Sequence, residues 1–395
     1  MKKSIVKLFG IIALSTSLLT SCSSDNNNDS KNPASTFVAD ANDFKGTISN
    51  GEVVLDAGTV YKLTGKLQVN DGATLTIPAG TVIQGTGGTK AYIAIAQGGK
   101  INVNGTLAKP VVMTSGLAVK GAGDWGGLVI CGRAPINRKT NGEITAQSEV
   151  ADLTYGGTIS NDNSGSIKFL RIEYAGAAYN TEKEFNGLSF FGVGSGTVVE
   201  NVQAFHGADD GFEFFGGTVN TSNLIAIGNE DDQFDWTEGW NGKNTNWYGK
   251  LNFGKGNRGI EADNFELGFS NTPIANPTIT NMTLIGPGSN ADASYTENQA
   301  IKLRRGTKGL ISNVVLSGWK TGIDVENDET IAFVGTALKV SNVNYISDVP
   351  TKTKGKKTDG SAYDVSAVAT ESAAANGAGN GIAQPNWATG WSVGF

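Results

Sequence analysis

Two consecutive stretches of the chain, 197–217 and 218–239, repeat each other with a spacing of 22 residues. A repeat of about 20 to 50 residues is the signature of a solenoid, because one repeat cannot bury its apolar face without a stacked neighbour. Each repeat alternates short β-branched or aromatic runs with Gly, Asn and Asp turns, which favours strands and excludes a helix. The repeat therefore predicts the coil of a parallel β-helix. The residues that recur are Asn201/Asn223, Asp209/Asp231, Asp210/Asp232, Phe212/Phe234 and Glu213/Asp235.

Two columns of residues extend this register along the chain. In the first, a four-residue pattern has apolar residues at its second and fourth positions and a polar residue at its third, as strands with one buried face require. Its members are 187–190, 211–214, 233–236, 259–262, 300–303 and 322–325. The second column consists of asparagines, which tolerate a left-handed bend and can stack their amides, so we interpret it as a structural ladder. Its members are Asn201, Asn223, Asn252, Asn281, Asn313 and Asn342.

The composition fits one elongated all-β domain. Among 395 residues there are 54 Gly and only 9 Pro, which suits many tight turns, and a solenoid grows without a second core. We expect the β-helix over 39–349, with a polar loop excursion at 133–165. Residues 350–381 are rich in Lys, Thr, Ser, Ala and Gly and are predicted to form a flexible, low-complexity excursion. Residues 382–395 contain two tryptophans and are expected to fold back as a cap over the open last coil.

The N-terminus has the pattern of a lipoprotein leader. A basic start and an apolar run over 8–19 precede the tetrapeptide Leu-Thr-Ser-Cys, which ends at Cys22. The run is too short to span a membrane, so 1–21 is predicted to be a signal peptide and Cys22 the lipidated first residue. Residues 22–38 would then be a flexible tether. Because Cys22 is acylated in this interpretation, Cys131 has no partner and is expected to be a buried apolar residue.

Five segments carry a resemblance to a known family: VNDGATLTIPAGTVIQG, INVNGTLAKPVVMTS, GDWGGLVICGRAPIN, SGSIKFLRIEYAG and GADDGFEFFGGTVN. Together they resemble the right-handed parallel β-helix lipoproteins of Bacteroidetes-type bacteria, which belong to the pectate-lyase-like structural class. The resemblance covers most of residues 50–345. It implies a right-handed β-helix anchored to the cell outer membrane, surface-exposed or periplasmic, and it implies no particular activity.

The polar position of the first column is acidic in three successive coils, at Glu213, Asp235 and Glu261. Because adjacent strands lie about 4.8 Å apart, these carboxylates are expected in direct file, where like charges cost up to about 1 kcal/mol per pair. Carboxylates suit Ca²⁺, which would relieve this repulsion. The predicted metal site consists of Asp209, Asp210, Glu213, Asp231, Asp232, Asp235 and Glu261. The alternative is a solvated acidic face, neutralised by Arg258, Lys302, Arg304 and Arg305.

Aromatic and cationic residues crowd the same region. Several aromatic residues fall in a stretch rich in Gly and Asn, where burial is not assured, and an exposed ring beside carboxylates suits a sugar. Phe212 and Phe234 occupy inward positions, so core stacking is the competing interpretation for the aromatic residues. The predicted ligand-binding residues are Trp236, Trp240, Trp247, Tyr248, Arg258, Lys302 and Arg304.

Three functions remain open at this stage. The first is a membrane-anchored, non-catalytic binding scaffold for a glycan or an outer-membrane partner. The second is a Ca²⁺-dependent polysaccharide lyase or a glycoside hydrolase, for which no catalytic residue can be assigned, since His206 is the single histidine and has no partner motif. The third is a structural or adhesive surface protein. Nucleic acid is not an expected partner, because the net charge is −6 and no large Lys/Arg cluster occurs.

Overall fold

The computed structural model describes residues 35–138, 143–251, 254–295 and 297–395. The chain divides into two units, and the described residues belong to the second, Pro33–Phe395. The predicted signal peptide, the lipidation site Cys22 and most of the tether fall outside the described residues. Within those residues, no helix combines the length and the apolar character that crossing a membrane would require.

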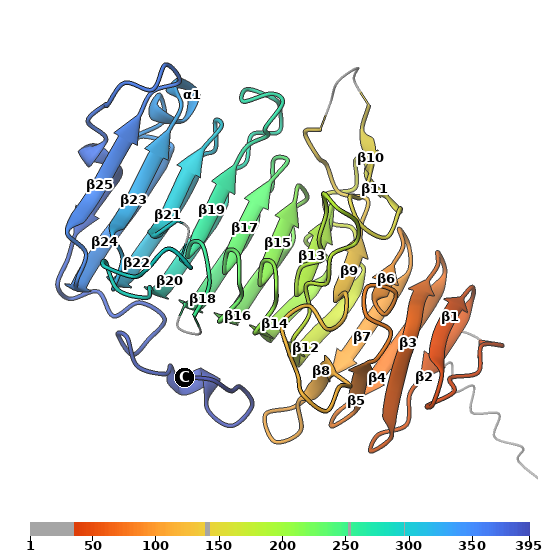
Figure 1. Cartoon of the computed structure of the whole chain (residues 1–395). Helices are drawn as coiled ribbons and strands as arrows, with labels where there is room; N and C mark the ends of the chain where they lie inside the picture. The colour runs from red at the N-terminus through yellow and green to blue at the C-terminus, as the bar shows by residue number, and fades with distance from the viewer. Residues whose placement is uncertain (1–34, 139–142, 252–253, 296) are drawn as a thin grey trace, which may run out of the picture. The chain divides into compact units, whose positions relative to one another are not determined.

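The chain winds into a right-handed parallel β-helix, which confirms the predicted fold class (Figure 1). One of its three faces, called the site sheet below, is built from one short strand per coil, and each strand pairs in parallel with the strand of the next coil. Its strands are β6 (Ile93–Ile95), β9 (Leu128–Cys131), β13 (Leu188–Phe191), β15 (Phe212–Phe215), β17 (Phe234–Thr237), β19 (Ile260–Asp263), β21 (Gln299–Arg304), β23 (Thr321–Glu326) and β25 (Thr351–Lys356).

The other two faces share long strands that bend in the middle, so that one strand serves both sheets. They are β12 (Gly165–Glu173), β14 (Val198–Phe205), β16 (Asn220–Ile227), β18 (Lys243–Lys250), β20 (Thr278–Ile285), β22 (Gly309–Ser317) and β24 (Leu338–Ser347). The N-terminal coils supply β1 (Phe44–Ile48), β2 (Gly51–Val54), β3 (Val60–Val69), β4 (Ala73–Pro78), β5 (Val82–Gly85), β7 (Lys100–Asn104) and β8 (Val111–Ser115).

The asparagine ladder forms at these bends, with one correction. Asn201, Asn223, Asn281 and Asn313 have positive φ and hydrogen-bond along the axis as predicted, but the member between Asn223 and Asn281 is Asn246. The prediction of Asn252 at this place was therefore wrong; that residue lies outside the described part of the chain. Asn342 also has positive φ, at 55°, and occupies the next bend.

The predicted loop excursion over 133–165 is an insertion that folds against the helix. It contains the hairpin of β10 (Thr145–Gln147) and β11 (Thr154–Gly156). Its apolar residues form a second buried cluster with outward-facing residues of β6, β9 and β13, including Ala94, Val129 and Phe191. The insertion therefore covers the outward face of the site sheet in these N-terminal coils.

Residues 350–381 are not simply an excursion. They contain β25, which pairs with β23, and β26 (Ala369–Glu371), which pairs with β24, so these residues continue the helix. Their polar composition is compatible with a strand because the residues of β25 are exposed or half-exposed. Short helical turns lie in the connections, at α1 (Asp328–Ile331), η1 (Ser366–Val368) and η2 (Asn386–Ala388).

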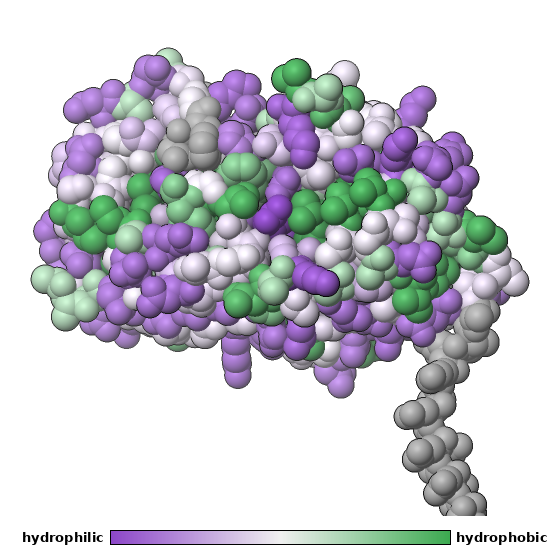
Figure 2. Space-filling model, turned by 90° about the horizontal axis from the view of Figure 1, so that it is seen from below, coloured by the Kyte–Doolittle hydropathy of each residue, from purple (hydrophilic) through white to green (hydrophobic). Residues whose placement is uncertain are grey.

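The C-terminal segment does not cap the last coil as predicted. It runs back over the outer face of the middle coils, where Trp391 packs with Ile225, Ile227 and Tyr248 (Figure 1). These outward-facing apolar residues need a cover, and the tail supplies it. From below, apolar residues form a broken band across the visible face, with polar residues on both margins (Figure 2).

Candidate functional site

The predicted file of carboxylates lies on the outward face of the site sheet. Glu213 in β15 is in register with Asp235 in β17, and Asp235 is in register with Glu261 in β19. The column continues in the predicted register from Ser189 to Asp324. Parallel pairing without a bulge therefore holds three acidic side chains side by side, in the order that the sequence repeat indicated. We call Glu213, Asp235 and Glu261 the acidic file.

The neighbours in the same column explain where uncompensated charge is concentrated. Towards the N-terminus the column contains Ala94 and Val129, on which the insertion packs. Towards the C-terminus Lys302, Asp324 and Lys354 alternate in sign, and Lys354 Nζ lies 3.0 Å from Asp324 Oδ2. The acidic file thus lies between coils whose outward residues are apolar and coils whose outward charges alternate in sign and balance one another.

Turns leading into β15 and β17 bring four more carboxylates to the file. Three sets of side chains each place carboxylate oxygens within 4.8 Å of one another. These sets are Asp209/Asp210/Asp231, Asp210/Glu213/Asp235 and Asp232/Asp235/Glu261. The structure therefore brings together all seven residues of the predicted metal site, and the sets overlap at Asp210 and Asp235.

The electrostatics of these carboxyl groups oppose ionisation. Burial raises the pKa of Asp210, Glu213 and Asp235 well above the ordinary range, and neighbouring carboxylates raise it further. Asp232 shows the same direction for the same leading cause, although Arg258 partly offsets it. At neutral pH such groups need a proton or a cation to balance their charge.

Arginines relieve one end of the cluster. Arg258 Nη1 lies 3.2 Å from Asp232 Oδ2 and 2.6 Å from Glu261 Oε1. Arg304 Nη2 lies 2.5 Å from Glu261 Oε2, and its Nε lies 2.8 Å from Asp263 Oδ1. The predicted alternative of an acidic face neutralised by arginines therefore describes this end well.

The middle of the cluster has no such relief. Within the described residues, no lysine or arginine forms an ion pair with Asp210, Glu213 or Asp235. Glu213 Oε2 instead accepts a hydrogen bond of 2.7 Å from the amide of Asn186. At the arginine end, Asp232 pairs with Arg258 through Oδ2, while its buried Oδ1 has no hydrogen-bond partner in the described part of the chain. Unmatched acceptors of this kind favour a bound cation or proton.

A cavity of about 180 Å³ opens over the file, and its walls come partly from residues that the sequence did not indicate. Arg138 and Glu149 come from the insertion, and Lys183 comes from the loop before β13. Arg138 Nη1 lies 3.2 Å from Oε1 of the buried Glu238, which also accepts a 2.5 Å hydrogen bond from Tyr155. These walls lack a periodic signal, so no pattern in the sequence could have identified them.

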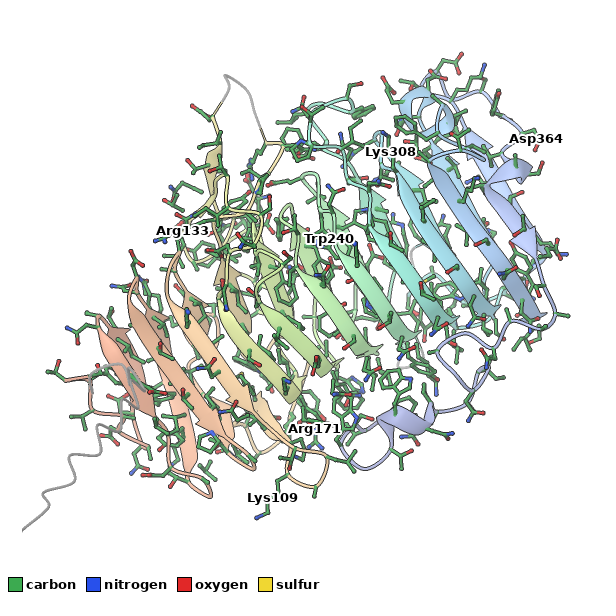
Figure 3. All side chains as sticks on the ribbon, turned by 180° about the vertical axis from the view of Figure 1, so that it is seen from behind. Lys109, Arg133, Arg171, Trp240, Lys308 and Asp364 are labelled. Carbon is green, nitrogen blue, oxygen red and sulfur yellow. The ribbon has the colours of Figure 1, made fainter. Side chains whose placement is uncertain are left out.

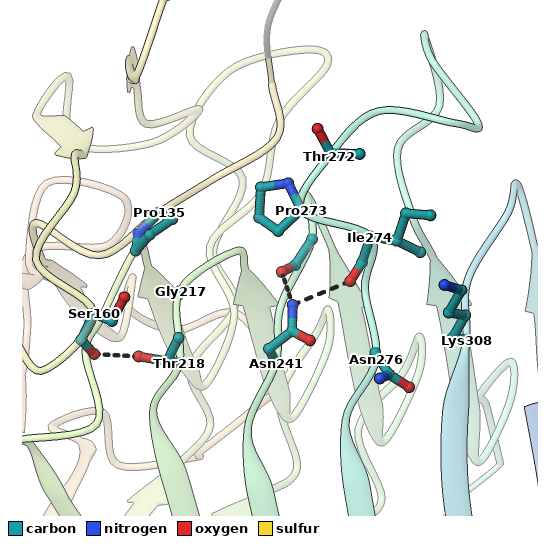
Figure 4. A pocket seen from close by; sticks show the side chains of 11 residues that line it. Pro135, Ser160, Gly217, Thr218, Asn241, Thr272, Pro273, Ile274, Asn276 and Lys308 are labelled. Carbon is teal, nitrogen blue, oxygen red and sulfur yellow. Dashed lines mark hydrogen bonds between the residues drawn. The ribbon is translucent and has the colours of Figure 1, made fainter. Parts of the chain in front are cut away.

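Further cavities lie elsewhere on the helix, and two of them concern the site sheet or its turns. One of about 580 Å³ lies over β21, β23 and β25 and is lined by Tyr295, Lys302, Lys320, Glu326 and Lys354, among others. The other, of about 460 Å³, lies at the turns that follow the site sheet, between Pro135 on one side and Pro273 and Ile274 on the other (Figure 4).

The aromatic part of the predicted ligand site is wrong. Trp236, Trp240 (labelled in Figure 3) and Trp247 are 0% exposed and lie in the main core. Tyr248 is 1% exposed and packs with residues of the C-terminal tail. Trp240 stacks on Phe214 with ring centres 4.0 Å apart. Indole N–H groups find internal acceptors, such as Val219 O for Trp240. Core stacking, the competing interpretation, accounts for these residues.

The cationic residues of the predicted ligand site do not border one common cavity. Arg258 and Lys302 are buried at 6% exposure each and are held in ion pairs, Lys302 with Glu297 and Glu326. Arg304 lines the cavity over the file. Only Arg304 thus borders the file's own cavity, while Lys302 borders the larger one.

Comparison with known proteins agrees with this geometry. The model of a family described as the pectate-lyase-like β-helix domain matches residues 46–392. The chain belongs to that family. No curated protein and no solved structure matches the chain in the same comparisons. Membership in the pectate-lyase-like β-helix family establishes the fold and leaves the chemistry to the residues of the site itself.

Proposed function

We propose that this protein is a lipid-anchored β-helix of the cell outer membrane that binds an acidic polysaccharide through Ca²⁺ held by the acidic file. The observation that carries the proposal is the set of carboxylate oxygens of Asp210, Glu213 and Asp235, within 4.8 Å of one another. None of these three side chains has an ion-pair partner in the described residues. The anchor rests on the leader that ends at Cys22 and on the resemblance to Bacteroidetes β-helix lipoproteins.

A cation at the file would leave room for a ligand. Ca²⁺ takes about six to eight oxygen ligands, so three carboxylates leave positions that a carboxylate or hydroxyl of a sugar can fill. The neighbouring cavity over β21–β25 adds Lys320, and also Lys354 and Lys356, which pair with Asp324 and Glu326 but remain half-exposed and can contact a second acidic group of the same chain. This pairing of a cation with lysines supports an acidic glycan over a neutral one.

The protonation of Arg304 and Arg258 favours binding over cleavage. A lyase needs a base, and burial alone would lower the pKa of Arg304, but Asp263 and Glu261 outweigh burial and raise it. The same balance raises the pKa of Arg258, with Asp232 the leading partner. Arginines held more firmly in their charged form are poor bases. The proposed role is therefore that of a non-catalytic scaffold.

Glycan binding and cleavage can be tested together. The purified chain is applied to an array of acidic and neutral polysaccharides in millimolar Ca²⁺ and in EGTA, and soluble uronides are assayed for cleavage. We expect Ca²⁺-dependent retention of acidic glycans without cleavage products. Cleavage would establish the lyase or hydrolase alternative. Absence of glycan binding would contradict the proposal and leave a protein partner or an adhesive role.

The anchor is tested by Cys22→Ser in the full chain expressed in a Gram-negative host. Because the apolar run is too short to hold the protein in a bilayer, we expect the variant to leave the washed membrane fraction. Cys131→Ser is the matched control and should stay with the membrane, since Cys131 is buried in the fold. Retention of processed Cys22→Ser protein in washed membranes would refute the lipid anchor.

A further inference from the structure

A cavity of about 510 Å³, called the lysine cavity below, lies on the N-terminal coils. The insertion separates it from the acidic file, because the insertion packs on the outward residues of β6, β9 and β13, while the file begins at β15. The walls of the lysine cavity contain three lysines, two tyrosines and, among the described residues, no carboxylate. These residues are Lys45, Lys66, Lys90, Tyr92 and Tyr179. In a chain of net charge −6, the cavity is a local concentration of positive charge beside aromatic rings.

The three lysines gather because the coils stack in register. β1 pairs in parallel with β3, and β3 pairs in parallel with β6. Lys45 lies within β1, Lys66 lies at the bend of β3, and Lys90 lies in the turn that leads into β6. The side chains therefore come from three successive coils, whose strands lie about 4.8 Å apart. Like charges on neighbouring strands repel one another.

The chain itself balances only part of this positive charge. Lys45 Nζ lies 2.8 Å from Asp43 Oδ1, and both side chains are about half exposed. Lys66 and Lys90 are exposed and form no ion pair with any residue that the structure describes. Two ammonium groups are therefore free to pair with an anion in the cavity.

Tyr92 points independently to a ligand in the lysine cavity. Its side chain is 8% exposed, and its ring packs against the buried Phe185 with ring centres 4.8 Å apart. The hydroxyl group of Tyr92 has no hydrogen-bond partner within the described part of the chain, although the residue borders the cavity. The hydroxyl of a buried tyrosine normally finds a partner, and a polar group of a ligand would supply one here.

Tyr179 adds an aromatic surface to the same cavity. Its ring meets Phe185 edge-on, with ring centres 5.4 Å apart, and its hydroxyl donates a hydrogen bond to Asp152 of the insertion. These contacts hold the half-buried ring in place beside the lysines. A fixed aromatic ring next to ammonium groups suits a sugar that carries an acidic group.

We propose that the lysine cavity binds an acidic sugar residue, carboxylated or sulfated, without the help of Ca²⁺. Lys66 and Lys90 pair with the acidic group, the Tyr92 hydroxyl hydrogen-bonds to the sugar, and the ring of Tyr179 packs against it. The inference rests on the proposed function for its ligand class, an acidic polysaccharide. It adds a second contact with that ligand, on the other side of the insertion from the acidic file.

The test is a calorimetric titration of the chain in EGTA with oligogalacturonate and with a sulfated dextran oligomer, with neutral dextran as the reference. We expect the parent to bind an acidic oligomer and not neutral dextran. Lys66→Gln with Lys90→Gln should raise the Kd about tenfold or more, because charge-assisted hydrogen bonds are lost. The matched control is Lys100→Gln with Lys109→Gln, two exposed lysines on β7 and in the turn after it, and it should bind like the parent.

Tyr92→Phe isolates the hydroxyl group and should raise the Kd about two- to tenfold, since one hydrogen bond is lost without a change in packing. Circular dichroism checks that each variant is folded. If Tyr92→Phe binds like the parent, the hydroxyl does not contact the sugar and its part in the proposal is wrong.

The outcomes separate the lysine cavity from the acidic file. A parent that binds neither acidic oligomer in EGTA would overturn the lysine cavity, while Ca²⁺-dependent retention of glycans would still support the proposed function. An unchanged Kd in the double lysine variant would place the binding elsewhere and overturn the assignment. Phosphatidylglycerol vesicles serve as a further probe. If the parent binds these vesicles through Lys66 and Lys90 but binds no oligosaccharide, the cavity contacts lipid headgroups and the sugar proposal is overturned.

Discussion

Glu238 is one of the residues that join the insertion to the coils. Its side chain is 4% exposed, and its two oxygens bind Arg138 and Tyr155, both from the insertion. Burial raises the pKa of Glu238 to about 7, against the opposing effects of Tyr155 and Arg138. The join between the insertion and the helix therefore responds to pH close to neutrality.

The expected pH effect follows from the direction of this shift. Since the pKa of Glu238 is about 7 in the fold and 4.5 ordinarily, the folded state binds the proton more tightly. Its contribution to stability is therefore full below pH 4.5 and is lost as the pH rises towards 7. The shift corresponds to about 3 kcal/mol at most. Glu238→Gln should flatten the dependence of the unfolding free energy on pH across this window.

This dependence is measured by urea unfolding at several pH values. Glu200→Gln is the matched control, because Glu200 is a half-exposed residue paired with Lys168 on the surface. The control should reproduce the parent curve. If Glu238→Gln shows the same slope as the parent between pH 4.5 and 7, the proton is not held by Glu238.

At the scale of elements, one asparagine amide per coil supports the bend in β14, β16, β18, β20 and β22, whereas β12 bends at Phe169. Asn246 has φ of 59°, donates 2.8 Å to Asn223 Oδ1 and accepts 2.9 Å from Asn281 Nδ2. Each side-chain hydrogen bond is worth about 0.5 to 1.5 kcal/mol, and a left-handed conformation costs a residue with a Cβ about 1 to 2 kcal/mol. The side-chain hydrogen bonds and the tolerance of Asn for positive φ therefore contribute separately to the stability of the bend.

Substitution at Asn246 separates these terms. Asn246→Gly should destabilise the protein by about 1 to 3 kcal/mol through the lost hydrogen bonds, and Asn246→Ala by about 1 kcal/mol more, because Ala resists positive φ. Denaturant unfolding of both variants measures the difference. Equal stability of the Ala and Gly variants would show that the backbone conformation contributes nothing at this bend.

The ladder also shows what the sequence can and cannot specify. The 22-residue spacing identified Asn201 and Asn223, but a later coil offers two candidates, Asn246 and Asn252, each followed by an aromatic residue. Counting forward from Asn223, the 22-residue period favours Asn246, which lies 23 residues on. A loop lengthens the next interval to 35 residues, so counting back from Asn281 points nearer to Asn252. The repeat predicts the position of each asparagine where successive coils have equal length, and the position is ambiguous where a loop lengthens one coil.

The same limit explains the candidate site. The seven acidic residues follow from the repeat, because register within equal coils transfers directly to space. Trp240 and Trp247 were misassigned, since their neighbours in the sequence are polar turn residues while their rings point into the core. Arg138 and Lys183 were missed because they reach the file from outside the repeat. Residues of an insertion do not follow the period of the repeat, so their contacts with the coils cannot be predicted from that period.

The acidic file makes the protein less stable as the pH rises when no cation is bound. The pKa of Asp210, Glu213 and Asp235 is raised, chiefly by burial, so the folded state holds their protons and loses stability as they ionise. In EGTA the melting temperature should therefore fall between pH 5 and pH 8. Ca²⁺ at a hundredfold excess over its Kd should restore about 3 kcal/mol at pH 8.

Calorimetric melting in EGTA and in Ca²⁺ at both pH values tests this expectation. Asp210→Asn with Asp232→Asn should reduce both the fall and the restoration, because fewer carboxylates remain to be balanced. A melting temperature that rises with pH in EGTA would mean that the file is already neutralised by its arginines.

At the scale of the whole molecule, the C-terminal tail ties together coils that are far apart in the sequence. It runs along the helix axis over the outward face of the strands that follow the bends. On its way it hydrogen-bonds to one residue in each of several coils, namely Asn344, Asn313, Thr283, Tyr248, Gln203 and Arg171. In a solenoid each coil otherwise contacts only its neighbours, so such a tail adds contacts between distant coils.

Removing the tail should therefore weaken the middle coils and reduce the cooperativity of unfolding. Deletion of 373–395 exposes Ile225, Ile227 and Tyr248, and Trp391→Ala alone should cost about 3 to 5 kcal/mol because the ring is 1% exposed. Hydrogen exchange should accelerate in β14, β16 and β18 and stay unchanged in β2 and β4, which the tail does not reach.

Asp364→Asn, at an exposed residue before η1 (Figure 3), is the control and should match the parent. Unchanged melting and exchange after Trp391→Ala would mean that the tail detaches without affecting the coils, and that their stability comes from stacking alone.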